Sequence, residues 1–328
     1  MSGPVKVEVF GRTDVGKARD HNEDSFIVAD LTTRNASLQP DVREHEVGRR
    51  GTLFMVADGM GGAAAGEVAS EMATSTVYEH MVGEWGSDQE VSEQRFAYRL
   101  KEAVEIANQQ IHEYATAHLE VRGMGTTTTA AGVFEGSLYL TQIGDSRGYL
   151  IRQGRIAQIT KDQSLMQRLV DAGELTEEEA AVSERRNIIL QALGPDPHVK
   201  VDLTRQELRR GDMLVMCSDG LSGLVKKEEI LGIVTQATDL VTCCRELIDL
   251  ANGRGGPDNI TCIVARFGGG LPAPDGSEPL GHQVYPLLDT ESTTEPVPVY
   301  KPEEVAGRKT ETTNPKPDPG PKKKWWPF

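Results

Sequence analysis

Asp58-Gly59-Met60-Gly61-Gly62 is the most informative stretch in this chain of 328 residues. It follows the apolar run at residues 53–57, so a β-strand is expected to carry a carboxylate directly into a glycine-rich turn. Three further aspartates stand beside apolar, strand-like runs in the same way: Asp145, Asp219 and Asp258. Four carboxylates at four strand ends are expected to converge in one cleft.

A cleft of this kind favours divalent metal ions. Carboxylates that are crowded together repel one another unless a cation lies between them. Clusters of oxygen ligands suit hard ions such as Mg²⁺ and Mn²⁺. The four aspartates therefore predict a binding site for divalent metal ions of this class.

Composition and charge exclude several classes of protein. The chain is 38% hydrophobic and 26% charged, which is typical of a globular protein, and its net charge of −15 disfavours binding to nucleic acid. Residues 1–12 lack the apolar segment of a secretory signal, and no stretch of about 18 apolar residues is present. The four cysteines show no metal-type spacing and are expected to be free, buried thiols. We therefore expect a cytoplasmic protein.

Proline content marks a domain boundary. Twelve of the 17 prolines lie in residues 268–328, a segment that begins with three glycines and carries clusters of Ser, Thr and Glu. Such a composition does not bury enough apolar surface to offset the entropy of ordering, so we expect a disordered tail. One folded domain is then expected over residues 1–267.

Hydrophobic periodicity predicts alternating blocks of strands and helices. Apolar residues recur at a spacing of four between Ala69 and Met81 and predict a helix over residues 66–82. A second helix is expected to follow a capping box that starts at Ser87. Further strands are expected at residues 5–12, 25–29, 126–134, 138–143, 148–152 and 155–159. These blocks indicate sheets covered by helices, although the pattern alone does not exclude a doubly wound parallel sheet.

A polar segment near the N-terminus adds a group that suits an anionic ligand. Arg19 carries a planar guanidinium that matches a phosphate group bidentately. Glu23 and Asp24 are suited to hold water molecules that are bound to a metal. The alternative is a charged surface loop in which Arg19 pairs with Asp20 or Glu23. The aspartates further along the chain favour the anion-binding interpretation.

The order of these motifs resembles that of the metal-dependent Ser/Thr protein phosphatases, the type 2C phosphatases, in their bacterial branch. Each motif alone is weak, but six in the right order across residues 5–267 are specific. The resemblance implies an α+β fold, a four-layer α-β-β-α sandwich with two antiparallel sheets flanked by helices. The motifs are Arg19-x-x-x-Glu23-Asp24, Asp58-Gly59-Met60-Gly61-Gly62, Gly123-Met124-Gly125-Thr126-Thr127, Gly144-Asp145-Ser146-Arg147, Ser218-Asp219-Gly220 and Asp258-Asn259.

The same resemblance implies a centre of two Mn²⁺ or Mg²⁺ ions. Asp58 would bridge both ions, and the carbonyl group of Gly59 would bind one of them. Asp219 and Asp258 would complete the coordination of the other. Asp145 matches the position that recruits a third, weaker metal ion in bacterial relatives.

Three residues beside this centre have implied roles or open alternatives. Arg19 would hold the substrate phosphate, and Glu23 would bind a metal ion through water. Asp145 has an alternative role as a turn residue that pairs with Arg147. The general acid has no assigned residue, because Met60 and Ala63 stand where many relatives have a histidine.

The implied activity is hydrolysis of phosphoserine and phosphothreonine in proteins by a metal-activated water. The expected partners are phosphoproteins that Ser/Thr kinases modify in signalling. The enzyme is expected to be a monomer. None of the four cysteines has an arginine six positions on, so the motif of a cysteine nucleophile is absent. Two alternatives stay open: a catalytically weak binding module that presents the tail, and a phosphatase of small phosphorylated metabolites. A weak module would be expected to lack Asp58, Asp219 or Asp258, and all three are present.

Residues 160–193 resemble the flap of that family. A helix is expected from Ser164 to a stop at Gly173, followed by a second short helix whose capping box starts at Thr176. The flap is expected to be a mobile insertion that helps to select phosphoprotein substrates. The alternative is a solvated helical hairpin without a role in selectivity.

The last seven residues, Lys322-Lys323-Lys324-Trp325-Trp326-Pro327-Phe328, combine basic and aromatic side chains. They suit either an anionic membrane surface or a groove on a protein partner, and an inert terminus is the remaining alternative. Residues 268–321 would then be a flexible spacer, which is expected to be removable without loss of turnover.

Overall fold

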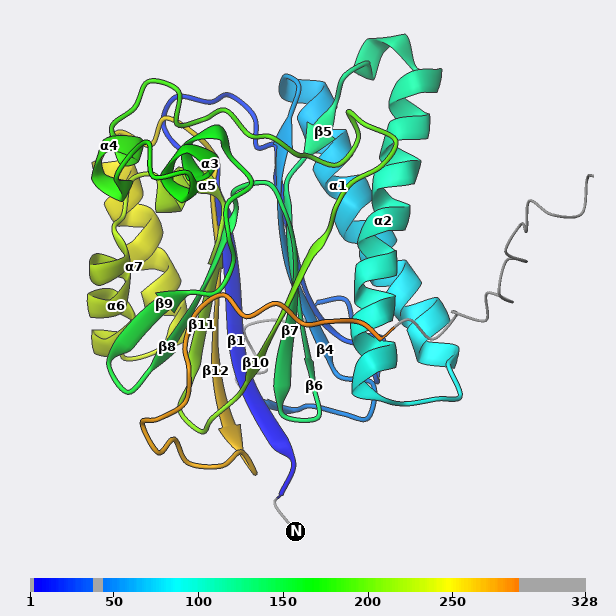
Figure 1. Ribbon diagram of the computed structural model, residues 1–328, viewed down its shortest axis with the longest axis vertical. Coiled ribbons are helices and arrows are strands. Elements are labelled where there is room, and N and C mark those ends of the chain that lie inside the picture. The colour runs from blue at the N-terminus through cyan, green and yellow to red at the C-terminus, as the bar shows by residue number, and fades with distance from the viewer. Residues whose placement is uncertain (1–2, 38–43, 289–328) are drawn as a thin grey trace, which may run out of the picture. The chain divides into compact units, whose positions relative to one another are not determined.

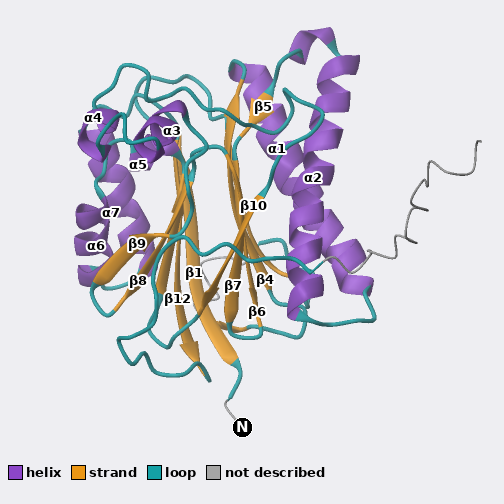
Figure 2. Ribbon diagram, viewed as in Figure 1, coloured by secondary structure: helices purple, strands orange, loops and turns teal. Residues whose placement is uncertain are grey.

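The structure, a computed structural model, describes residues 3–37 and 44–288 (Figure 1). Two antiparallel sheets form the centre of the compact unit Met1–Leu287, and helices cover the outer face of each sheet (Figure 2). The predicted α+β sandwich of four layers is therefore confirmed. The predicted basic and aromatic tip, residues 322–328, lies outside the described residues.

Each sheet is built from strands that are far apart in the sequence. The first sheet has the order β3-β1-β12-β11-β8-β9, with bounds His45–Glu46, Val5–Asp14, Ile260–Gly269, Met213–Cys217, Arg147–Arg152 and Arg155–Gln158. The second has the order β10-β7-β6-β4-β2, with bounds Asp202–Glu207, Ser137–Ile143, Thr128–Phe134, Thr52–Met60 and Asp24–Asp30. A short strand, β5 (Gly125–Thr126), pairs with the end of β4.

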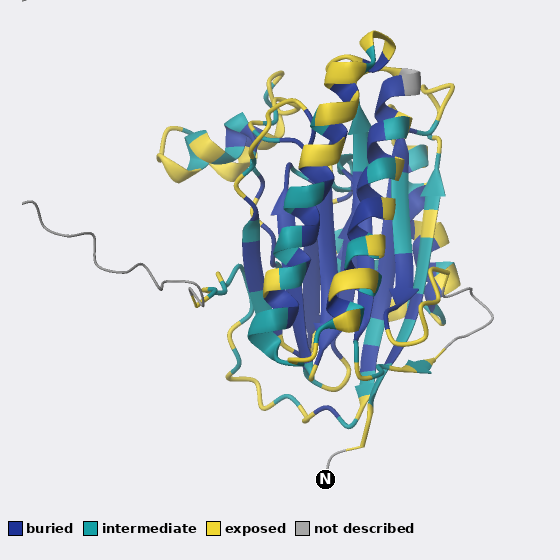
Figure 3. Cartoon of the chain, turned by 90° about the vertical axis from the view of Figure 1, so that its right-hand side faces the viewer, coloured by how far each residue is buried: buried dark blue, intermediate teal, exposed yellow. Residues whose placement is uncertain are grey.

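The long helices form the two outer layers. Helices α1 (Ala63–His80) and α2 (Glu93–Ala117) pack on the second sheet, with buried inner faces and exposed outer faces (Figure 3). Helices α6 (Lys227–Gln236) and α7 (Leu240–Gly253) pack on the first sheet. Shorter helical segments are a π-helical turn (Met81–Trp85), a 3₁₀ turn (Leu119–Val121), α3 (Leu165–Asp171), α4 (Glu177–Ala181) and α5 (Asp219–Ser222). No helix within the described ranges is long and apolar enough to cross a membrane.

Both faces of strand β4 are buried, which explains its unbroken apolar sequence. Phe54 and Val56 pack between the two sheets, whereas Leu53, Met55 and Ala57 pack against the core under α1 and α2. Successive side chains of a strand point to opposite faces, so both sets are needed. Strands buried on both faces have similar sequences in parallel and antiparallel sheets, and for this reason the hydrophobic pattern alone left both arrangements open.

Helix α2 begins later than the sequence predicts. Its N-cap is Ser92, whose Oγ accepts a hydrogen bond from the backbone N–H of Arg95 at 3.3 Å, so the capping box assigned to Ser87 is wrong. Asp88 lies within the predicted box, but its carboxylate forms ion pairs with Arg95 and Arg99, each at 2.8 Å. These arginines occupy both carboxylate oxygens, so Asp88 connects the loop before α2 to two side chains of the helix.

The two predicted flap helices and the state of the cysteines are confirmed. Ser164 caps α3 by accepting the N–H of Gln167 at 3.2 Å, and Thr176 forms the predicted capping box of α4 with Glu179. The four cysteines are free and buried.

The predicted domain boundary at residue 267 is wrong, because the compact unit continues to Leu287. Residues 270–287, which we call the strap, run from the end of β12 along β10, the outer strand of the second sheet (Figure 1). The backbone N–H of Arg205 donates to the carbonyl of Gln283 at 3.0 Å, and that of Tyr285 donates to Leu203 at 2.8 Å. The strap therefore covers a sheet edge that would otherwise be open to pairing with another chain.

Side chains also fasten the strap to the domain. Leu271 is only 4% exposed, and the ring of Tyr285 lies edge-on to the ring of Tyr139 with centroids 5.4 Å apart. The Arg209 guanidinium forms an ion pair with Glu278 at 2.9 Å. Tyr139 and Arg209 are far from the strap in the sequence, so the proline-rich composition of the strap gave no sign of these contacts.

We expect a chain that ends at Gly269 to be less stable than the full chain by about 3 kcal/mol. About 2 kcal/mol comes from exposing the site of Leu271, and about 1 kcal/mol from losing the aromatic pair. Urea denaturation of both chains measures the difference. A chain that ends at Leu288 is the control and should match the full chain, whereas equal stability of all three would show that the strap is a passive spacer.

Candidate metal centre

Four separate chain segments bring the predicted aspartates to one end of the sandwich. Asp58 lies near the end of β4, and Asp219 opens helix α5 directly after β11. Asp145 lies in the turn between β7 and β8, and Asp258 lies just before β12. The charges of Asp219, Asp145 and Asp258 all act on the Asp58 carboxyl, so the structure brings together the four aspartates that the sequence predicts.

The carboxyl groups are close enough to disfavour ionisation of the whole cluster. Burial, followed by the neighbouring charge of Asp24, raises the pKa of Asp58 well above its usual range. Asp219 lies within hydrogen-bonding reach of Asp58, and burial and the charge of Asp258 raise its pKa. Burial raises the pKa of Asp145 to about 7, with a further contribution from Asp219. A divalent cation would remove this repulsion by favouring the ionised carboxylates.

Asp24 supplies a second sign that the cluster suits a cation. Its register partner on the adjacent strand is Asp58. One oxygen, Oδ2, accepts hydrogen bonds from the hydroxyl groups of Ser218 at 2.8 Å and Thr261 at 2.6 Å. The other, Oδ1, is buried and has no hydrogen-bond partner among the described residues. A buried carboxylate oxygen without a donor is costly, and metal-bound water would satisfy it.

The carboxylates of the cluster lie near one another, but they do not form a complete coordination site around an ion. The described ranges contain no group of three or more Asp, Glu, His or Cys side chains that already enclose an ion. The fit to metal ions therefore rests on the crowded carboxyl groups and on the unsatisfied oxygen of Asp24. Both features favour cations with oxygen ligands.

Gly59 occupies a position where only glycine fits. Its backbone N–H donates to the carbonyl of Glu23 at 3.1 Å. A Cβ atom at residue 59 would collide with the carbonyl oxygens of Gly66 and Glu23. The close approach of these backbones places Gly59 and Glu23 together, as the predicted site requires.

Glu23 is held against the start of helix α1. Its carboxylate lies so close to Gly66 that a Cβ atom at residue 66 would overlap it. Its backbone carbonyl also accepts a hydrogen bond from the Ser70 hydroxyl at 2.6 Å. Burial raises the pKa of Glu23, whereas the charge of Arg19 acts in the opposite direction.

Arg19 reaches the aspartate cluster from the loop between β1 and β2. Its guanidinium forms an ion pair with Asp258 at 3.0 Å, instead of pairing with Asp20 or Glu23 as in the surface-loop alternative. The Arg19 side chain is 47% exposed. A cation that is open to solvent beside a buried acidic cluster is well placed to meet an incoming anion.

Asp145 is not the partner of Arg147. The Arg147 guanidinium instead binds Asp162, with Nη2 2.7 Å from Oδ2 and Nε 3.0 Å from the same oxygen. This removes the alternative in which Asp145 serves only to pair with that arginine. The Arg147–Asp162 pair also joins the start of β8 to the beginning of the flap.

Several polar residues that support the site were missed as functional residues. Thr127 Oγ1 accepts the backbone N–H of Asp58 at 3.2 Å and lies 2.8 Å from Ser146 Oγ. Ser218 and Asn259 adjoin predicted ligands in the sequence, and this adjacency was the available signal. His21 contributes its backbone carbonyl to the site, where it accepts a hydrogen bond from Asn259 at 2.9 Å.

The fold and the cluster of aspartates define a metal-dependent enzyme scaffold, and comparisons with known proteins identify it. A sequence model described as protein phosphatase 2C matches residues 33–252. Serine/threonine phosphatase stp of Listeria welshimeri is 35% identical over 254 residues, which are 77% of this chain and 93% of that protein. Protein phosphatase PhpP of Streptococcus pneumoniae is 36% identical over 79% of this chain and 96% of its own length. The chain therefore belongs to the protein phosphatase 2C family.

Solved structures agree with this assignment. The serine/threonine phosphatase PstP/Ppp of Mycobacterium tuberculosis is 37% identical, with a TM-score of 0.67 over 80% of this chain and 98% of that chain. A structure of the PstP catalytic domain in complex with two manganese ions is also 37% identical, with a TM-score of 0.65 over 80% of this chain and 99% of its own. The predicted family and fold class are both confirmed.

Proposed function

We propose that this chain hydrolyses phosphoserine and phosphothreonine in proteins at a centre of two Mn²⁺ or Mg²⁺ ions. The observation that carries the proposal is the convergence of Asp58, Asp219 and Asp258 in one cluster, where burial and the neighbouring carboxylates raise the pKa of Asp58 and Asp219. Relatives at 35–39% identity are named serine/threonine phosphatases, and a related catalytic domain binds two manganese ions. The proposed activity and the proposed metal ions agree with the membership of the protein phosphatase 2C family.

The residues present fit the two ions. Asp58 would bridge them, Asp219 and Asp258 would complete one, and the Gly59 carbonyl would bind the other, with Asp145 available to a third. When bound, the ions supply Lewis-acid polarisation of the phosphoryl oxygens and lower the pKa of water.

The remaining residues orient the substrate and the solvent. Arg19 binds the phosphate group through its exposed guanidinium. Glu23 and Asp24 hold water in place with their carboxylates, and the hydroxyl groups of Ser218 and Thr261 fix the orientation of Asp24.

The first test of this function is metal removal. We expect turnover of p-nitrophenyl phosphate and of a phosphothreonine peptide to fall to background after chelation and to return with Mn²⁺ or Mg²⁺, since the carboxylates alone repel an anionic phosphate. Addition of Ca²⁺ at equal concentration controls for non-specific ionic effects. Full turnover after exhaustive chelation would contradict the proposed function.

The second test concerns the phosphate-binding role of Arg19. We expect Arg19→Ala to raise KM for a phosphopeptide, and the Ki of inorganic phosphate, about 10- to 100-fold, which corresponds to a lost charge-assisted contact of about 1.5–3 kcal/mol. Steady-state kinetics measure both constants. Arg12→Ala, a change on the neighbouring strand β1, is the control. An unchanged kcat/KM in Arg19→Ala would contradict the assigned role.

The flap offers a surface for the selection of protein substrates. Its exposed apolar side chains are Val182, Ile188 and Leu190, which are 80%, 44% and 45% exposed. Replacement of Ile188 and Leu190 by Ser is expected to lower kcat/KM for a phosphoprotein and to leave p-nitrophenyl phosphate unaffected. A flap without a role in selectivity would leave both values unchanged.

We also propose that this enzyme is cytoplasmic and that residues 322–328 dock it to an anionic membrane or to a protein partner. Their three lysines and two tryptophans carry this proposal, which rests on composition alone. Sedimentation with anionic liposomes, in low and high salt, separates the two partners, because lysine attraction to lipid is screened by salt. An inert terminus would be favoured if the double variant Trp325→Ala/Trp326→Ala localises normally and the wild-type protein binds neither liposomes nor a protein partner.

A further inference from the structure

The loop between β1 and β2, residues 15–23, carries both Arg19 and Glu23 but contains no helix or strand. It crosses from the first sheet to the second, since β1 and β2 belong to different sheets. The Arg19 side chain is anchored to Asp258, which is itself a proposed metal ligand. Because Asp258 would also bind a metal ion, the position of Arg19 depends in addition on the backbone of its own loop.

One buried side chain holds this backbone at three points. Asn259 is 4% exposed and lies just before β12. Its Oδ1 accepts the backbone N–H of Glu23 at 2.8 Å. Its Nδ2 donates to the carbonyls of Val15 and His21, each at 2.9 Å. An asparagine amide has two N–H donors, and here both of them bind the loop on either side of Arg19.

The backbone contacts beside Asn259 fit the same arrangement. Gly16 has φ of +78°, and a Cβ atom at that residue would collide with the carbonyl oxygen of Asp258. The backbone N–H of Lys17 donates to the carbonyl of Gly256 at 2.7 Å. The loop therefore lies directly on the segment that contains Asp258 and Asn259.

We propose that Asn259 is a positioning residue for phosphate binding, which sets the loop so that Arg19 faces the metal-binding cleft. The proposal rests on the proposed phosphatase function and adds to it the element that holds the phosphate-binding arginine. Asn259 touches neither substrate nor metal in this account. It acts through the backbone of residues 15–23, so its loss should change phosphate affinity more than the chemical step.

Asn259→Asp is the sharpest test, because it preserves the size of the side chain and the acceptor for Glu23. It replaces Nδ2, with its two N–H donors, by a single oxygen that faces the carbonyls of Val15 and His21 and repels the loop. We expect the Ki of inorganic phosphate and the KM of a phosphopeptide to rise about tenfold, with a smaller change in kcat. Asn259→Ala, which removes the contacts without adding repulsion, is the second variant and should act in the same direction.

A double-mutant cycle distinguishes positioning from a general structural effect. In the Arg19→Ala background, Asn259→Asp should raise the Ki of phosphate no further, because the arginine that it positions is already absent. Amide hydrogen exchange of residues 15–23 should accelerate in Asn259→Asp, and the rise in Tm caused by Mn²⁺ should persist. Additive effects of the two changes on Ki would overturn the proposal, as would unchanged exchange of the loop.

Asn108→Asp is the matched control. Asn108 is 1% exposed, its Nδ2 donates to the carbonyl of Asp196 at 3.1 Å, and its Oδ1 accepts the N–H of Gly194 at 2.9 Å. This variant should lower the Tm without changing the Ki of phosphate, and an equal rise in Ki would contradict the specific role of Asn259. Failure of the proposed phosphatase function would appear separately, as a wild-type protein without Mn²⁺-dependent turnover.

Discussion

Asp58→Asn is expected to lower the turnover of a phosphothreonine peptide at least about 10³-fold in saturating Mn²⁺. Asparagine has nearly the same size but lacks the charge that would bridge two divalent ions. Stabilisation of transition-state charge by such ions is worth several kcal/mol, and about 4 kcal/mol corresponds to about 10³-fold in rate. Single-turnover and steady-state assays measure the loss.

Thermal unfolding separates loss of metal from loss of fold in this variant. The Mn²⁺-induced rise in Tm should disappear in Asp58→Asn, whereas the chelated variant should be at least as stable as the chelated wild type. The reason is that Asp58 contributes a buried carboxylate that its acidic neighbours destabilise. The control is Asp20→Asn, which changes an exposed acid in the polar segment near the N-terminus and should keep wild-type turnover. More than a tenth of the wild-type rate in Asp58→Asn would contradict its assignment as the bridging ligand.

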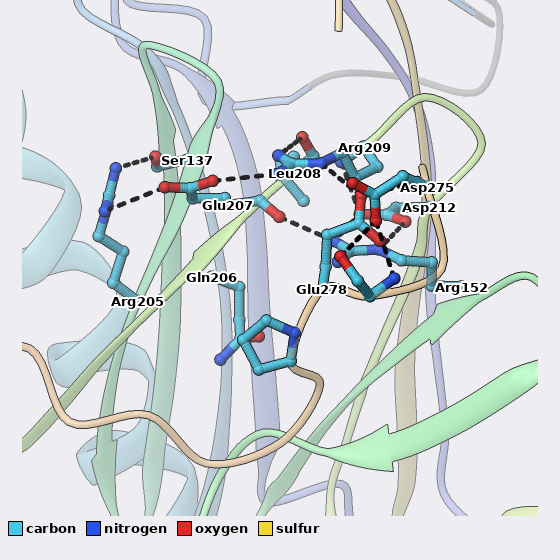
Figure 4. A network of polar contacts seen from close by, with 12 residues as sticks. Ser137, Arg152, Arg205, Gln206, Glu207, Leu208, Arg209, Asp212, Asp275 and Glu278 are labelled. Carbon is cyan, nitrogen blue, oxygen red and sulfur yellow. Dashed lines mark hydrogen bonds and ion pairs between the residues drawn. The ribbon is translucent and has the colours of Figure 1, made fainter. Parts of the chain in front are cut away.

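Arg152→Ala is expected to lower the free energy of unfolding by about 3–5 kcal/mol, the typical cost of removing one partner of a buried ion pair. Arg152 and Asp212 are 2% and 0% exposed, and the guanidinium binds both oxygens of the carboxylate, at 2.8 and 2.6 Å (Figure 4). Arg152 Nη2 also donates to the carbonyl of Glu207 at 2.7 Å. Its removal would leave Asp212 charged and buried without its cationic partner.

Urea denaturation at constant m-value measures this effect. Arg266→Ala is the control, because Arg266 pairs with Glu8 at 3.2 Å on the surface and is 41% exposed, so its loss should cost no more than about 1 kcal/mol. Arg152 stands at the far end of β8 from Arg147 and the metal cleft, so kcat of the folded variant should stay at the wild-type value. Destabilisation no greater than that of Arg266→Ala would contradict the expected role of the pair.

Short-range signals in the sequence predicted those parts of the structure that neighbouring residues determine. The capping box that starts at Thr176 was identified, because a cap depends on residues only three positions away. The capping box at Ser87 was wrong because the preceding helical segment continues to this point, where the N–H of Asp88 donates to the carbonyl of Glu84 at 2.9 Å, and α2 begins only after Ser92. A four-residue pattern does not show whether the chain around it is free to begin a helix.

The identity of the candidate ligands and the class of metal that they suit could be predicted from the amino-acid sequence. Asp58, Asp145, Asp219 and Asp258 stand beside strand-like runs, and strand ends bring side chains together at the rim of a sheet. Their chemistry is a property of the side chains and does not depend on which strands are neighbours. The order of the motifs then indicated the family, which the comparisons confirm.

The three-dimensional structure was needed to show the order of the strands in each sheet, where the domain ends and what holds the Arg19 loop. Strand β4 is apolar on both faces, so its sequence is compatible with either strand direction. The strap is ordered by contacts with β10, and the loop of Arg19 is fixed by Asn259 from the opposite end of the chain. Each of these features depends on hydrogen bonds and burial between residues far apart in sequence, and such contacts leave no periodic pattern in the segments that make them.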